Sequence, residues 1–130
     1  QLFQDIVDGK SINLLYPEYK IYTSAIVGGI VPIALGTALG LKREGVDELV
    51  YLFIGDMTSE TGTVHEAYKY AASHSLPIKF IIECNNKSVC TETLKTWNLP
   101  DYSLKGLPNV QFYEYELPWP HAGAGVRVQF

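Results

Sequence analysis

The stretch LVYLFIGDMTSETGTVHEAYKYAASHSLPIKFIIECNN, residues 49–86, decides the fold. It opens with the continuous apolar run 49–54, which is typical of a strand buried on both faces. Apolar side chains then recur at helical spacing over residues 64–72, and a second apolar run follows at 78–83. A strand, a helix and a second strand joined by short connections form a βαβ crossover. We therefore predict an α/β fold whose parallel sheet carries helices on both faces.

The flanking segments extend this pattern. Apolar positions recur at helical spacing from Pro32 onward, and a proline suits the first turn of a helix. Residues 109–117 predict a weaker third strand, and residues 87–108 predict a loop because they are rich in polar and turn residues. We expect one domain over residues 1–130, with its core at 20–95, a C-terminal strand and tail at 109–130, and a packed segment at 118–125. The chain begins with glutamine, so we expect an N-terminal portion to be missing.

Composition excludes several classes of protein. The 130 residues are 47% hydrophobic and 18% charged with a net charge of −4, which favours neither a nucleic-acid nor an anionic-membrane partner. Residues 25–41 are uncharged, but their glycines and proline favour a buried helix over a membrane span. The chain shows no secretory features and its two cysteines favour reduced thiols, so we predict a cytoplasmic protein. Two cysteines make no zinc site, and the three scattered histidines share no ligand spacing.

Polar side chains stand where the two predicted strands end. Asp56 follows the first strand and Asn85 the second, at a spacing of roughly 30 residues, which is what one crossover needs to return to the same edge. A carboxylate and an amide oxygen beside a helix N-terminus suit Mg²⁺ with a diphosphate. The alternatives are structural: Asp56 as the N-cap of the next helix, and Asn85 as a turn residue.

The same residues resemble a known family. The GDM…NN segment and the flanking AIVGGIVPIALGTALGLK are similar to the alpha subunits of thiamine diphosphate-dependent 2-oxoacid dehydrogenases, such as the pyruvate, acetoin and branched-chain enzymes. The resemblance covers roughly residues 20–95. It implies two cofactors, thiamine diphosphate and Mg²⁺. The implied metal ligands are Asp56, Asn85 and the carbonyl of Lys87, and the implied cofactor contacts are Ala25, Val27, Gly55, Met57 and Thr58.

The family also implies partners that this chain lacks. A beta-like subunit would supply the glutamate that activates the cofactor, and the substrate would be a small 2-oxo acid; no catalytic residue is assigned to this chain. Met57 departs from the family pattern, which has glycine there, and Asn13 stands near a position where histidine is usual. Two alternatives remain open. One is a non-catalytic relative with a decayed cofactor site, and the other is a decarboxylase- or transketolase-like enzyme that shares the cofactor.

Overall fold

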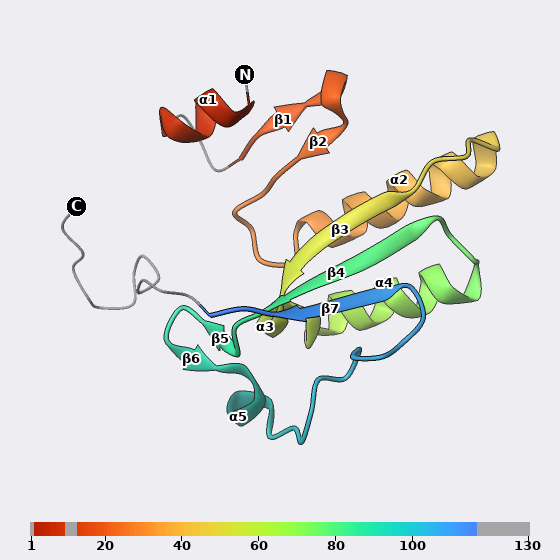
Figure 1. Cartoon of the computed structure of the whole chain (residues 1–130). Helices are drawn as coiled ribbons and strands as arrows, with labels where there is room; N and C mark the ends of the chain where they lie inside the picture. Colours follow the sequence, from red (N-terminus) through yellow and green to blue (C-terminus); the bar gives the residue numbers. More distant parts are fainter. Residues whose placement is uncertain (1, 10–12, 117–130) are drawn as a thin grey trace.

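The central sheet is parallel and has the strand order β3–β4–β7 (Figure 1). The computed structural model describes residues 2–9 and 13–116. The elements that build and cover the sheet are α2 (Ile30–Glu44), β3 (Val50–Gly55), α3 (Asp56–Ser59), α4 (Gly62–Ser73), β4 (Ile78–Cys84) and β7 (Val110–Glu114). The prediction of an α/β fold with a parallel sheet is confirmed, and each predicted strand and helix is present. Residues 118–125, predicted to pack as a C-terminal segment, lie outside the described residues.

The core lies on one face of this sheet. α2 and α4 contact each other, and their buried side chains join those of β3 and β4 in one cluster. The cluster is built from Val31, Ala34 and Ala38 of α2, Leu52 and Ile54 of β3, Val64, Ala67 and Ala71 of α4, Leu76, Ile78, Phe80 and Ile82 in and before β4, and Leu104. Within the described residues, both long helices therefore cover the same face, which differs from the predicted arrangement with helices on both faces.

The opposite face of β3 is open. Tyr51 and Phe53 are each 58% exposed, whereas Leu52 between them is 1% exposed. The prediction that this strand is buried on both faces is wrong for the part of the chain that the structure describes. Successive side chains of a strand point to opposite faces. In β3 one set meets the helices and the other meets solvent.

Short elements also form in two segments for which the sequence predicted no helix or strand. The N-terminal part forms α1 (Leu2–Val7) and a hairpin of β1 (Leu15–Tyr16) and β2 (Ile21–Tyr22), with the 3-10 turn η1 (Pro17–Tyr19) between them. The predicted loop at 87–108 contains a second hairpin, β5 (Lys87–Ser88) with β6 (Thr91–Glu92), followed by α5 (Thr93–Trp97). These elements are too short to show a hydrophobic period.

Helix direction brings the N-termini of both long helices to one edge. α2 ends at Gly45, which has the left-handed φ of 68° that favours glycine, and β3 starts a few residues later. α2 consequently runs back along β3 and begins where β3 ends, as Figure 1 shows. α4 also starts near the end of β3, after the short helix α3. No helix among the described residues is long and apolar enough to cross a membrane.

Candidate cofactor site

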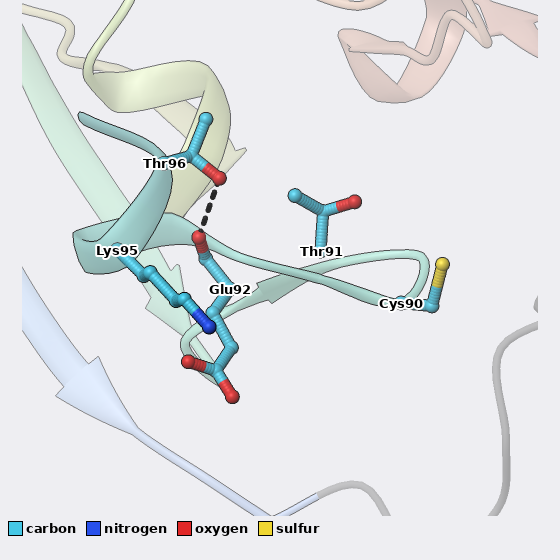
Figure 2. Close-up of a pocket in the computed structure, with 5 residues that line it drawn as sticks. All are labelled: Cys90, Thr91, Glu92, Lys95 and Thr96. Carbon is cyan, nitrogen blue, oxygen red and sulfur yellow. Dashed lines mark hydrogen bonds between the residues drawn. The ribbon is translucent and has the colours of Figure 1, made fainter.

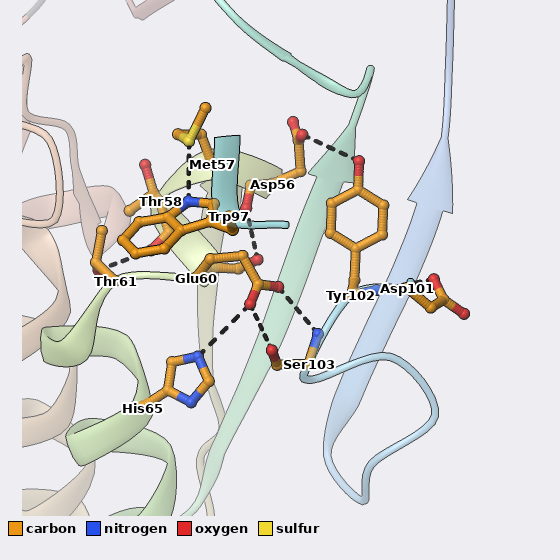
Figure 3. A network of polar contacts seen from close by, with 11 residues as sticks. Asp56, Met57, Thr58, Glu60, Thr61, His65, Trp97, Asp101, Tyr102 and Ser103 are labelled. Atoms are coloured by element: carbon orange, nitrogen blue, oxygen red, sulfur yellow. Dashed lines mark hydrogen bonds and ion pairs between the residues drawn. The ribbon is translucent and has the colours of Figure 1, made fainter. Parts of the chain in front are cut away.

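Asp56 is a buried carboxylate at the carboxyl edge of the sheet. It is the first residue of α3, directly after β3, and is 1% exposed. Gly55 occupies the N-cap position of α3 and Thr61 that of α4, and neither helix has a side-chain cap hydrogen bond. The alternative that Asp56 caps the following helix is therefore wrong. Its oxygen Oδ2 instead accepts a hydrogen bond from the Tyr102 hydroxyl at 3.3 Å, as Figure 3 shows.

Tyr102 links Asp56 to the end of β4. Its hydroxyl also lies 2.9 Å from Oδ1 of Asn86, and the same Oδ1 accepts a hydrogen bond from the backbone N–H of Leu94 at 3.3 Å. The backbone carbonyl of Asn86 accepts from the N–H of Thr93 at 3.2 Å. Burial, then hydrogen bonding with Cys84 and the negative charge of Asp56, raise the pKa of Tyr102 above its ordinary value. The phenol is therefore a neutral donor beside the carboxylate.

The second predicted ligand, Asn85, is half-buried and forms a turn. Its Oδ1 accepts a hydrogen bond from the backbone N–H of Lys87 at 3.0 Å. An amide oxygen carries two lone pairs, so this bond leaves one acceptor direction for a cation. The backbone of α3 contacts β5, which places the strand that contains Lys87 beside the helix that begins with Asp56. The predicted metal residues thus gather at one edge.

The predicted diphosphate residues lie in the same turn. A methyl group built onto Gly55 would meet no atom within 4 Å, so space is open at the end of β3. Met57 and Thr58 occupy the first turn of α3, where backbone N–H groups lack helical partners. Met57 has helical backbone geometry and needs no positive φ, so a side chain here strains nothing. Its sulfur accepts a hydrogen bond from the indole N–H of Trp97 at 3.1 Å.

Ala25 and Val27 lie on the loop between β2 and α2 and are exposed. The N–H of Ala25 donates to Oδ1 of Asn13 at 2.8 Å, so the asparagine that stands near the usual histidine position holds this loop. No hydrogen bond in the described part of the chain joins Ala25 or Val27 to Asp56 or its neighbours. The loop precedes α2, whose first turn shares the edge at which β3 ends.

A second buried carboxylate anchors the loop that contains Tyr102. Both oxygens of Glu60 accept hydrogen bonds from Ser103, from its backbone N–H at 3.0 Å and from its hydroxyl at 2.6 Å (Figure 3). His65 Nε2 lies 3.8 Å from the same carboxylate. Adjacent residues of one loop thus hold the carboxylates at both ends of the Asp56–Glu60 turn.

A pocket on α5 and β6 is separate from these residues. Figure 2 shows the residues that line it, which are Cys90, Thr91, Glu92, Lys95 and Thr96. None of the predicted cofactor or metal residues lines it. Within it the Thr96 hydroxyl donates to the Glu92 carbonyl at 2.7 Å, an ordinary contact within one helical turn.

The chemistry of the Asp56 site fits a cation. Within the described residues no basic side chain forms an ion pair with Asp56, although burying a carboxylate without a counter-charge is unfavourable. No cluster of three histidine, cysteine or acidic side chains occurs in the same residues. A single carboxylate with amide and carbonyl oxygens suits Mg²⁺, which takes its remaining ligands from phosphate and water. These residues therefore fit a magnesium diphosphate group.

Sequence reasoning missed Tyr102, Asn86, Glu60 and Trp97. Tyr102 and Leu104 are both buried in a segment predicted as a polar loop. Their apolar side chains two residues apart were the available signal, since a solvated loop rarely buries alternate residues. The sequence carried no such signal for Glu60, because an acidic residue in a turn usually faces water.

Comparison with known proteins shows the family of this chain. A model of the dehydrogenase E1 component family matches residues 4–109. The alpha subunit of the pyruvate dehydrogenase E1 component from Rickettsia bellii is 35% identical over 99 residues, 75% of this chain and 30% of the relative. The mitochondrial somatic form of this subunit from Macaca fascicularis is 36% identical over 92 residues, 71% of this chain and 24% of the relative.

The chain belongs to the dehydrogenase E1 component family. This decides against the decarboxylase- or transketolase-like alternative. The chain spans about 30% of the length of the first of these relatives. A solved structure, described as a putative thiamin diphosphate-dependent enzyme from Mycobacterium smegmatis, aligns with a TM-score of 0.42 at 35% identity, over 55% of this chain and 13% of that one.

Proposed function

We propose that this chain is the Mg²⁺–thiamine diphosphate-binding, alpha-type part of a 2-oxoacid dehydrogenase. The observation that carries the proposal is Asp56, a buried carboxylate without a basic partner in the described residues, at the edge of a parallel sheet where such folds bind ligands. Membership of the dehydrogenase E1 component family and the similarity to pyruvate dehydrogenase alpha subunits support it.

Each predicted residue has one role in this proposal. Asp56 and Asn85 give side-chain oxygens to Mg²⁺, and Lys87 gives its backbone carbonyl. Gly55 and the amides of Met57 and Thr58 lie against the diphosphate, and the backbone of Ala25 and Val27 holds the pyrimidine ring. Bound thiamine diphosphate supplies the carbon nucleophile and electron sink that decarboxylation of a 2-oxo acid requires.

A beta-like subunit completes the site in this proposal. No residue of this chain is assigned the activating glutamate, so the partner provides it, together with part of the pocket for the small 2-oxo acid. The prediction of a cytoplasmic location stays a prediction, because one of the matched relatives is described as mitochondrial. The single-domain prediction for residues 1–130 likewise stays a prediction.

Calorimetric titration of thiamine diphosphate into the full chain tests the proposal, without metal, with Mg²⁺, and with a candidate beta chain added. We expect binding that requires Mg²⁺ and strengthens with the partner. Asp56→Asn keeps the shape of the side chain and should abolish the Mg²⁺-dependent binding of thiamine diphosphate. Asp101→Asn is the matched control, because Asp101 is an exposed carboxylate on the loop that contains Tyr102.

Unchanged binding in Asp56→Asn would refute the ligand assignment. Absence of heat in every mixture would favour the second candidate, a relative whose cofactor site has decayed. The observation that favours this candidate is Met57, which stands where the family has glycine and has a partner of its own in Trp97.

A further inference from the structure

We propose that the Tyr102 hydroxyl restricts Asp56 to one-oxygen coordination and thereby makes the site selective for Mg²⁺ over Ca²⁺. This inference rests on the proposed function, because it concerns the cation that Asp56 would hold. It assigns a specificity-determining role to a residue that touches the metal ligand and not the metal.

The contact engages one of the two oxygens of Asp56. The Tyr102 hydroxyl lies 3.3 Å from Oδ2, and within the described residues no hydrogen bond joins it to Oδ1. A hydrogen bond to Oδ2 occupies one of its lone-pair directions and withdraws charge from it. Oδ1 is then the stronger donor to a cation, and chelation through both oxygens becomes unfavourable.

The orientation of the donor is fixed by its surroundings. Tyr102 is 7% exposed, and its ring packs on Phe112 at a centroid distance of 4.9 Å. Asn86 provides a second acceptor at 2.9 Å, and the Leu94 N–H requires the amide oxygen of Asn86, not its nitrogen, on this side. The single phenolic proton is therefore shared between Asn86 and Asp56. The anionic oxygen is the stronger acceptor, although it is the more distant one.

The loop is held independently of the hydroxyl. Ser103 binds both oxygens of Glu60, and the Tyr68 hydroxyl donates to the carbonyl of Pro108 at 3.2 Å. Removing the oxygen of Tyr102 should therefore change the environment of Asp56 while the loop keeps its place.

Cation chemistry gives the direction of the effect. Ca²⁺ takes six to eight oxygens and often uses both oxygens of a carboxylate, whereas Mg²⁺ takes six ligands in a strict octahedron and suits a single carboxylate oxygen. A hydrogen bond on Oδ2 disfavours the two-oxygen mode. The hydrogen bond therefore weakens the binding of Ca²⁺ and leaves the coordination of Mg²⁺ intact.

The test is calorimetric binding of thiamine diphosphate to the full chain with either Mg²⁺ or Ca²⁺, in wild type, Tyr102→Phe and Tyr68→Phe. Wild type should bind more tightly with Mg²⁺ by about tenfold, the scale of one hydrogen bond to a charged group. Tyr102→Phe keeps the ring and should lower the Mg²⁺:Ca²⁺ affinity ratio several-fold. Tyr68→Phe removes a hydroxyl of α4 that donates to the same loop, and it should keep the wild-type ratio.

The outcomes separate the two proposals. Two results overturn this inference while the cofactor-binding function stands. One is that wild type binds thiamine diphosphate equally tightly with Mg²⁺ and with Ca²⁺. The other is that Tyr102→Phe leaves the Mg²⁺:Ca²⁺ affinity ratio unchanged. Wild type without binding in either metal overturns both. A ratio that falls equally in Tyr68→Phe would show a general loosening of the loop and would also overturn the role of Tyr102. The wild-type comparison can overturn the inference even when a variant does not fold, because equal affinities with the two cations leave no selectivity for Tyr102 to explain.

Discussion

The indole N–H of Trp97 donates to the sulfur of Met57, with the two atoms 3.1 Å apart. The pair joins the first turn of α3 to the end of α5, segments that are distant in sequence. Met57 therefore does more than occupy a position where the family has glycine. It connects the turn that follows β3 to the short helix beside it.

Met57→Gly should lower the free energy of unfolding by about 1–2 kcal/mol. The change removes the sulfur contact with Trp97 and places a glycine in a helical turn. Urea denaturation measures the loss, and Met57→Leu, which keeps an apolar side chain, should lose less. Because Met57→Gly loses the contact with Trp97, we do not expect this variant to bind the cofactor more tightly than wild type. A glycine variant as stable as wild type would show that the Trp97 contact contributes nothing.

Glu60→Ala should destabilise the fold by about 2–3 kcal/mol, because the N–H and hydroxyl of Ser103 lose a charged acceptor. Thermal unfolding followed by circular dichroism measures the change. Glu66→Ala, at an exposed position on α4, is the control and should stay within about 0.5 kcal/mol of wild type. Equal effects of the two substitutions would contradict a special role for Glu60.

Neighbouring residues of β3 should respond very differently to truncation. Leu52→Ala should cost about 2–5 kcal/mol, since this side chain is 1% exposed among the helices. Phe53→Ala should cost less than about 1 kcal/mol, because Phe53 is 58% exposed on the other face. Denaturant titrations of the isolated chain compare the two. Similar losses would mean that something covers the second face.

Stability should fall as pH rises from about 10 towards 12, in part through Tyr16. The hydrogen bond to the Asp5 carboxylate, then burial and the charge of Asp5, raise the pKa of Tyr16 from 10.0 to about 12. Below pH 10 both states hold the proton and the stabilisation is complete. Above pH 10 the unfolded chain loses the Tyr16 proton before the folded chain does. The unfolded state is then stabilised relative to the folded state.

Tyr16→Phe has no proton to release and should show a shallower loss of stability over this interval. Urea midpoints measured below pH 10 and near pH 12 give the slopes, with Tyr19→Phe, at an exposed position, as control. An identical slope in Tyr16→Phe and wild type would remove Tyr16 from the alkaline transition.

The sequence predicted the positions of the strands and helices better than the burial of their faces and the contacts of their side chains. Apolar runs located β3 and β4, and Asp56 and Asn85 were placed at the strand ends because topology alone fixes that edge. The exposure of Phe53 was not predictable, because a continuous apolar run reads the same whether one face or two are covered. The Tyr102–Asp56 contact joins residues far apart in the chain. It depends on the path of a loop that carries no periodic signal.

The order of the central strands has a consequence for folding. β3, β4 and β7 lie side by side in the order in which they occur along the chain. Each later strand pairs with the outer edge of the one before it. The loops closed by the two pairings are similar in length, and closure entropy changes only slowly with length. This sheet can therefore grow in one direction during synthesis, because β4 and β7 each find the neighbouring strand already made.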